Sequence, residues 1–163
     1  MNAIAIFNDK IKGSVKFHQC QKHTQAIVEF NLSGFKPHKT HGIHIHRYGI
    51  LSVENACDST CEHYNPYNSL HGSQELYGND RHVGDLINNL NSDKNGNFQY
   101  SYVDDLIDVS DIVGRSVVIH SGVDDLGRWR SDYSDPKRQK ASSTTGDAGS
   151  RIACSVIGLA PDN

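Results

Sequence analysis

Several features that would direct this sequence to other classes of protein are scarce or missing. Only four cysteines occur in 163 residues, too few for a secreted scaffold held together by disulfides. The net charge is −3, so the chain carries no basic footprint for nucleic acid. Hydrophobic residues make up 36%, and no apolar run approaches the length of a membrane span. We therefore expect a protein that binds neither nucleic acid nor a membrane.

The start of the chain also lacks a basic region followed by a long apolar segment, which a secretory signal would have. We accordingly expect a cytoplasmic protein. A length of 163 residues is typical of one domain, and no internal repeat or linker argues for a second. The expected domain is 1–163.

Short runs of alternating apolar and polar residues dominate the hydrophobic pattern. In the clearest run, Ala26, Val28, Phe30 and Leu32 share one face of a possible strand. Similar runs occupy 15–17, 98–102, 117–120 and 152–159. No long segment has helical periodicity, and the Asn-Gly pair within 93–96 predicts a hairpin turn. The pattern indicates an all-β sandwich or barrel, interrupted by two long polar loops at about 48–83 and 121–149.

Histidine is the one residue type in excess, with ten copies. Side chains at i and i+2 of a strand point to one face, so His44 and His46 can reach a single metal ion. The first long loop and the residues just after it add His63, His71, His82 and Asp85, a donor set that suits four-coordinate zinc. His120 ends a strand-like run. Taken separately, each of these pieces is more simply explained as histidines on a polar surface.

Six stretches, taken together, resemble the copper/zinc superoxide dismutase family in the family's own order. They are HGIHIH at 41–46, HYNP at 63–66, RHVGDL at 81–86, GRSVVIH at 114–120, DDLG at 124–127 and GDAGSRIAC at 146–154. The form of the last stretch is similar to the eukaryotic cytosolic branch, which occurs in eukaryotes and some of their viruses. In a virus-encoded protein, the expected location would be the host cytoplasm. The resemblance implies an eight-stranded Greek-key sandwich or flattened barrel with two long functional loops.

The resemblance also implies the metal ligands. Copper would be bound by His44, His46, His63 and His120, and zinc by His63, His71, His82 and Asp85. His63 would thus bridge both metals. Asp124 would act behind the ligands, linking His46 to His71, and His41 would have a structural role. Arg151 would dock the substrate anion beside copper, since a guanidinium is always charged and is preorganised.

The family resemblance pairs Cys57 with Cys154 in a disulfide. Because Cys61 is only four residues from Cys57, the sequence leaves a Cys61–Cys154 pairing open. Cys20 would be a free thiol.

The function implied is an antioxidant one, the conversion of superoxide to dioxygen and hydrogen peroxide by copper that cycles between Cu(II) and Cu(I). A metal-binding module without catalysis, such as a copper-chaperone domain or an inactive decoy, is the alternative that the fold alone would allow. The family tends to form homodimers, with candidate surfaces here at 50–51, at 112–114 and in the last strand, and a copper chaperone is a further candidate partner.

Two departures from the family's usual pattern bear on the substrate's approach. Asp58 stands where a small neutral residue is usual, and its charge would oppose entry of an anion. The second loop is long and carries basic residues that could steer superoxide, namely Arg128, Arg130, Lys137, Arg138 and Lys140.

Overall fold

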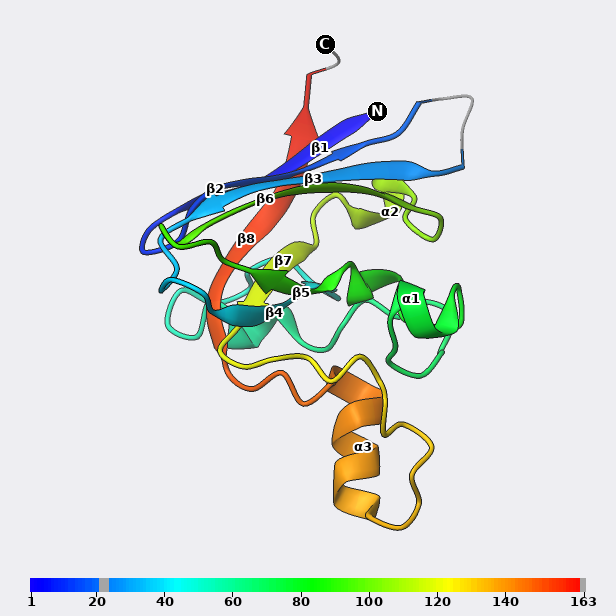
Figure 1. The fold of residues 1–163 in the computed structure, drawn as a ribbon. Coiled ribbons are helices and arrows are strands. Elements are labelled where there is room, and N and C mark those ends of the chain that lie inside the picture. Colours follow the sequence, from blue (N-terminus) through cyan, green and yellow to red (C-terminus); the bar gives the residue numbers. More distant parts are fainter. Residues whose placement is uncertain (21–23, 162–163) are drawn as a thin grey trace.

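The computed structural model describes residues 1–20 and 24–161, which form a strongly curved antiparallel sheet (Figure 1). Its strands are β1 (Asn2–Asn8), β2 (Lys12–His18), β3 (Ala26–Ser33), β4 (Thr40–His46), β5 (Asn88–Asn91), β6 (Asn97–Asp104), β7 (Ser116–His120) and β8 (Arg151–Ala160). The strand order is β5-β4-β7-β8-β1-β2-β3-β6. The sequence-based prediction of an all-β fold with eight strands is confirmed.

The long strand β8 joins the two layers of the nearly closed barrel. Its first half pairs with β7, and Ile157 to Ala160 pair with β1. In Figure 1, β8 accordingly runs from the layer of β4, β5 and β7 to the layer of β1, β2, β3 and β6. Strand β7 lies between β4 and β8 and not beside β6, which precedes it in the chain, so the connection crosses as in a Greek key.

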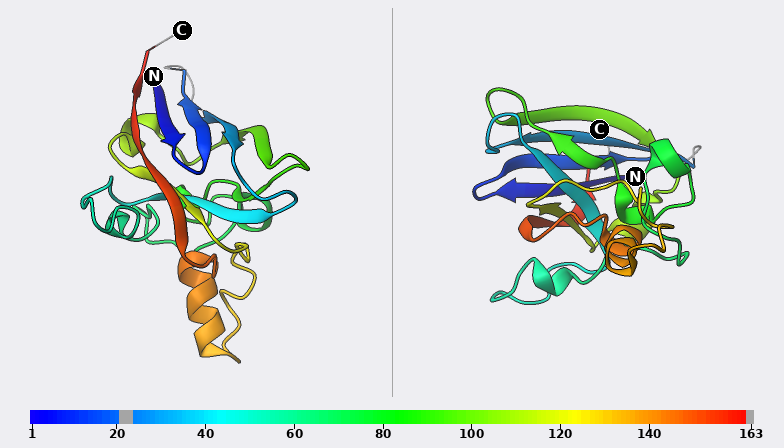
Figure 2. Two further views of the ribbon diagram at one scale, coloured as in Figure 1. Left: turned by 90° about the vertical axis from the view of Figure 1, so that its left-hand side faces the viewer. Right: turned by 60° about the horizontal axis from the view of Figure 1, so that its bottom comes forward.

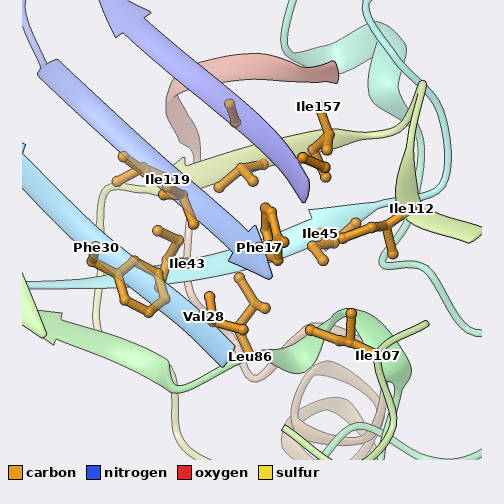
Figure 3. Close-up of a cluster of buried hydrophobic side chains, with 14 of the residues drawn as sticks. Phe17, Val28, Phe30, Ile43, Ile45, Leu86, Ile107, Ile112, Ile119 and Ile157 are labelled. Atoms are coloured by element: carbon orange, nitrogen blue, oxygen red, sulfur yellow. The ribbon is translucent and has the colours of Figure 1, made fainter. Parts of the chain in front are cut away.

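The alternating residues fill the barrel interior as predicted. Along β3, Ala26, Val28, Phe30 and Leu32 are buried while the residues between them are exposed. Figure 3 shows Phe17 and Val28 from one layer facing Ile43 and Ile45 of β4. This packing keeps β4 in a fixed position, and β4 carries two of the predicted metal ligands.

The turn at 93–96 forms, but the prediction that it closes a hairpin is wrong. The amide of Asp93 donates to the carbonyl of Asn97, and Gly96 has the positive φ that the turn requires. The strands on either side, β5 and β6, nevertheless lie at opposite edges of the sheet and form no ladder in the described residues. Instead, β5 pairs with β4, and β6 pairs with β3 over all eight of its residues.

The two long polar segments hold short helices. The first contains the 3₁₀ helix η1 (Asp58–Thr60), α1 (Gln74–Tyr77) and the 3₁₀ helix η2 (Val83–Asp85), and α2 (Val109–Ile112) precedes β7. The second contains α3 (Pro136–Thr145), which projects from the barrel on the side away from the start of β1 (Figures 1 and 2).

Hydrophobic periodicity missed α3 because this helix buries no apolar side chain. Its ends are nevertheless marked in the sequence: Asp135 caps the first turn, Pro136 occupies it, and Gly146 follows in the left-handed conformation. No helix in the described residues is long and apolar enough to span a membrane.

Candidate metal centre

Strand β4 presents His44 and His46 on the face opposite its core residues. Ile43 and Ile45 point into the barrel, while the two histidines lie under the long loops and are 0% and 1% exposed. The prediction that both imidazoles share one face of a strand is confirmed. His120 ends the neighbouring strand β7, which pairs with β4 in antiparallel register and brings this third ring beside the first two.

The first loop delivers His63 by running briefly antiparallel to β4. His63 pairs with His46 as an isolated bridge, and the amide of Tyr64 donates to the carbonyl of Ile45 at 2.8 Å. The ring of His63 thereby stacks near that of His44, with 3.9 Å between the ring centroids. Backbone hydrogen bonds thus bring together histidines that lie 19 residues apart in the chain.

These four side chains form one group that could hold a metal ion. His44, His46, His63 and His120 each offer a ring nitrogen, and all four nitrogens lie within 4.8 Å of one another. Nδ1 of His44 and Nε2 of His63 are buried and have no hydrogen-bond partner among the described residues. The Nε2 atoms of His46 and His120 are 3.3 Å apart. Four converging imidazoles suit copper, and the two orphaned nitrogens are atoms that a metal would satisfy.

The outer nitrogens of two of these rings are held by backbone carbonyls. Nδ1 of His46 bonds the carbonyl of Cys61 at 2.7 Å, and Nδ1 of His120 bonds that of Gly149 at 3.1 Å. Burial lowers the pKa of His46 to about 2. Burial, assisted by the charge of His44, lowers the pKa of His120 to about 4. Both rings therefore favour the neutral form, which is the form that binds metals.

A second group of donors gathers around one oxygen of Asp85. Oδ1 of this carboxylate lies 2.9 Å from Nδ1 of His63, 2.8 Å from Nδ1 of His71 and 3.1 Å from Nδ1 of His82. Four-coordinate zinc with bonds of about 2.0 Å places its ligand atoms about 3.3 Å apart, so the group has the size of a zinc site. The other oxygen, Oδ2, accepts from the amides of Gly72 and His82, each at 3.0 Å. The side chain is therefore fixed in place.

The ring of His63 belongs to both groups. Its Nδ1 faces Asp85 in the second group, and its orphaned Nε2 faces the first. Burial and the charge of His44 keep the pKa of His63 well below its usual value. One buried imidazole thus has one nitrogen available to each of two metal ions.

Asp124 connects the two groups, although not through the partner that the sequence comparison implied. Its Oδ2 lies 2.6 Å from Nε2 of His44, and its Oδ1 lies 3.0 Å from Nε2 of His71. The expected link to His46 is therefore wrong. His44 and His46 point to the same face but lie about 6.6 Å apart along the strand, and the more distant His46 meets the carbonyl of Cys61 instead.

Asp124 and Asp85 also control the charge of His71. Burial alone would lower the pKa of His71, but these two carboxylates outweigh it and raise the pKa to about 10. Burial alone would likewise raise the pKa of Asp124, and the hydrogen bonds from His44 and His71 lower it instead. Two buried carboxylates beside one ring favour a positive charge at this place, as a divalent cation would supply.

Arg151 is fixed by the turn that the disulfide anchors. Its Nη1 donates to the carbonyls of Cys57 at 2.7 Å and Asp58 at 3.0 Å, and its Nη2 donates to the carbonyl of Cys61. Cys57 is bonded to Cys154 of β8, the same strand that begins at Arg151. The pairing implied by the family resemblance is confirmed over the Cys61 alternative, and Cys61 is a free thiol.

His41 and several residues without a prediction support the centre. Nδ1 of His41 lies 2.8 Å from the carbonyl of His120, outside both metal groups, which agrees with a structural role. Asn89 exchanges two hydrogen bonds with the backbone of Asp124, at 2.8 and 2.9 Å. The wholly buried pair of Arg81 and Asp104, 3.0 Å apart, ties the first loop to β6. The sequence offered no signal for these contacts beyond the charge of Arg81 inside the RHVGDL stretch.

Fold and site together define a class of protein: a β-barrel that carries two buried groups of donors, each able to hold a metal ion, with one histidine common to both. Comparison with known proteins makes the class specific. The sequence profile of the copper/zinc superoxide dismutase family matches residues 11–157. The chain belongs to the copper/zinc superoxide dismutase family.

Individual relatives cover nearly the whole chain. The Cu-Zn superoxide dismutase of Paramecium bursaria Chlorella virus 1 is 38% identical over 166 aligned positions, which cover 100% of this chain and 81% of that protein. The Cu-Zn superoxide dismutase of Humicola lutea is 39% identical and covers 98% of this chain and 99% of its own length. The crystal structure of the clock protein EA4 superposes with a TM-score of 0.82 at 36% identity, and the match covers 98% of this chain and 94% of that one. The chain is therefore an oxidoreductase that disproportionates superoxide, with copper and zinc as its cofactors.

Proposed function

We propose that His44, His46, His63 and His120 hold copper and that His63, His71, His82 and Asp85 hold zinc. The observation that carries the assignment is the ring of His63, whose two nitrogens face two different donor groups. The donor chemistry agrees, because imidazoles alone suit copper and a closed set of three nitrogens and one carboxylate oxygen suits zinc.

Arg151 would bind the superoxide anion next to the copper ligands. Its guanidinium is aimed by carbonyls of the turn at 57–61, and the carbonyl of Cys61 bonds both Arg151 and His46. The anion site and a copper ligand would therefore share one backbone group, which fixes their relative position. A guanidinium held by neutral carbonyls keeps its full positive charge for the substrate.

His63 would handle protons as well as metal. When bound, copper supplies the one-electron steps between Cu(II) and Cu(I), and zinc, which has no redox chemistry, supplies a fixed positive charge. Two superoxide anions and two protons yield one dioxygen and one hydrogen peroxide. Nε2 of His63 is buried beside the copper group and is the atom at which this chain would hold a proton for the outgoing peroxide, as a general acid.

Pulse radiolysis of the copper- and zinc-loaded protein tests this assignment. Arg151→Gln removes a charged contact to the anion, so we expect the second-order rate to fall about 10- to 100-fold while both metals stay bound. His120→Ala should lose copper and His82→Ala should lose zinc, as measured by metal analysis after dialysis. Lys16→Gln, an exposed charge change on β2, serves as control. Full metal retention in both histidine variants would contradict the ligand assignment.

We also propose that two copies associate through the surface around Ile50 and Leu51. These side chains are 39% and 69% exposed, and Val156 of β8 adds a side chain that is 41% exposed. Gly114 adjoins this surface, because its carbonyl lies close to Gly49, the residue before Ile50. The distance is 2.6 Å from that carbonyl to the point where a side chain on Gly49 would begin. Ile112, which the sequence had offered for this surface, is fully buried and contributes nothing to it. Sedimentation should give a dimer for the native chain and a monomer for Leu51→Glu.

The proposed location is the cytoplasm, supported by the similarity of residues 146–154 to the eukaryotic cytosolic branch. Cell fractionation with an antibody to the chain tests it. A copper chaperone is proposed as the partner that loads copper. The test is to measure the copper occupancy of the protein in cells that have a copper chaperone and in cells that lack it.

A further inference from the structure

Arg130 does not join the exposed basic residues of the second loop, where the sequence placed it for steering the substrate. It is 7% exposed, whereas its neighbour Arg128 is exposed. Its guanidinium lies over the ring of Tyr77 at 3.5 Å and pairs with the carboxylate of Asp80 at 2.6 Å. A second donor reaches the carbonyl of Asp80 at 2.8 Å. Arg130 is therefore a buried charge whose position is fixed by several contacts with the first long loop. Steering of the substrate would not require a fixed position.

The same guanidinium reaches the backbone of His71. Its Nη1 donates to the carbonyl of His71 at 3.4 Å, and the amide of His71 donates to the carbonyl of Ser143 in α3 at 2.8 Å. Both backbone polar groups of His71 are therefore bonded to the second loop. The close approach leaves no spare room, because a side chain on Gly72 would begin 3.0 Å from Nη1 of Arg130.

Helix α3 holds Arg130 in turn. The side chain of Gln139 donates to the carbonyl of Arg130 at 2.8 Å, and the hydroxyl of Ser142 accepts from the amide of Trp129 at 3.1 Å. The only side chains that α3 buries are Ser142 and Ser143, so the helix contributes little to the hydrophobic core. Its hydrogen bonds to residues outside the helix include those to Arg130, to Trp129, to Asp125 and to His71.

We propose that Arg130 is a positioning residue for zinc, which fixes the backbone of His71 so that the ring stands ready before the metal arrives. The inference rests on the proposed assignment of His71 as a zinc ligand. Residues that orient a metal ligand are typically worth about 10- to 100-fold in metal affinity, because an unheld ligand must be ordered when the metal binds. The second loop thereby acts on the zinc site as well as on the path of the substrate.

Zinc competition with a chromophoric chelator, on the copper-free oxidised protein, tests the proposal. We expect Arg130→Gln to raise the zinc dissociation constant about 10-fold or more. Arg128→Gln removes the same charge two residues away and should stay within about 2-fold of the native chain, since exposed charges contribute little. Cobalt(II) placed in the zinc site should show a changed visible spectrum in Arg130→Gln only, which a general loss of stability would not produce.

Asp80→Asn provides a second route if Arg130→Gln fails to fold. Its carboxylate side chain is 69% exposed and contacts Arg130 from outside, so the barrel tolerates the change, and zinc binding should weaken about 2- to 5-fold. An unchanged zinc affinity in Arg130→Gln, or in Asp80→Asn where the first variant does not fold, overturns the inference. His82→Ala separates the two proposals. If it binds zinc as tightly as the native chain, the ligand assignment itself is wrong. If it loses zinc while Arg130→Gln does not, only the role of Arg130 falls.

Discussion

Removal of the disulfide should both destabilise the chain and release the anion site. Cys57 and Cys154 are 97 residues apart, and closing a loop of that length restricts the unfolded chain by an amount worth about 4.7 kcal/mol at 25 °C. Replacing both cysteines by serine restores that freedom to the unfolded state. For a chain of 163 residues, each kcal/mol shifts the melting temperature by about 2–4 °C, so we expect a fall of about 9–19 °C.

The assay is scanning calorimetry of metal-free protein, so that metal binding does not contribute. The double variant Cys57→Ser/Cys154→Ser is preferable to a single one, because Cys61 is close enough in sequence to pair with Cys154 once Cys57 is gone. Cys20→Ser, which removes an exposed free thiol, is the matched control and should melt with the native protein.

The same variant has a predicted effect on catalysis. Three carbonyls between Cys57 and Cys61 hold Arg151, and the disulfide ties that turn to β8. With both metals bound, the rate of superoxide decay should therefore fall in this variant. The fall should be larger than in other double serine variants of comparable stability. A melting temperature within about 3 °C of the native value would refute the loop-closure reasoning, and an unchanged rate would refute the coupling to Arg151.

Two further predictions concern charged groups near the site, and a third concerns the core of the barrel. The carboxylate of Asp124 accepts hydrogen bonds from ring nitrogens of His44 and His71, and Asp124→Asn turns an NH₂ group toward one of them. Zinc should therefore bind about 10- to 100-fold more weakly, as measured by chelator competition. Unaltered zinc affinity would mean that this link does not orient the two rings. Asp58 is exposed, and its backbone carbonyl accepts a hydrogen bond from Arg151. Asp58→Asn removes a negative charge from this residue, so pulse radiolysis should show a rate of superoxide decay about 2-fold higher at low salt and a smaller gain at high salt; a slower variant would show that the charge assists entry. Phe17 is 1% exposed, so Phe17→Ala leaves a cavity and should lower the free energy of unfolding, measured in urea, by about 3–5 kcal/mol. Ile6 is 59% exposed, and Ile6→Ala should lower it by under about 1 kcal/mol. Equal losses in the two variants would contradict the packing of the barrel.

The order of residue types along the chain was enough to predict which residues face the core and which side chains can bind metals. A strand alternates its faces whatever surrounds it, so Val28 and Phe30 could be placed inside and His44 and His46 together on one face. The family's motifs then supplied the ligand sets and the Cys57–Cys154 pairing, because several separate stretches matched in order. Local turn chemistry was equally readable, as at Gly96.

How those elements meet could be learned only from the folded structure. The turn at 93–96 looks like a hairpin, but β5 pairs with β4 and β6 pairs with β3, which places the two strands at opposite edges of the sheet. Asp124 bonds His44 and not His46, since two side chains on one face still differ in height along the strand. In the sequence, Arg130 cannot be distinguished from the solvated charges of its loop. In the structure, the path of the first loop brings Asp80 and Tyr77 into contact with it. Such contacts join residues about 50 positions apart in the chain, and loop paths of that length are set by many weak packing interactions that leave no periodic signal in the sequence.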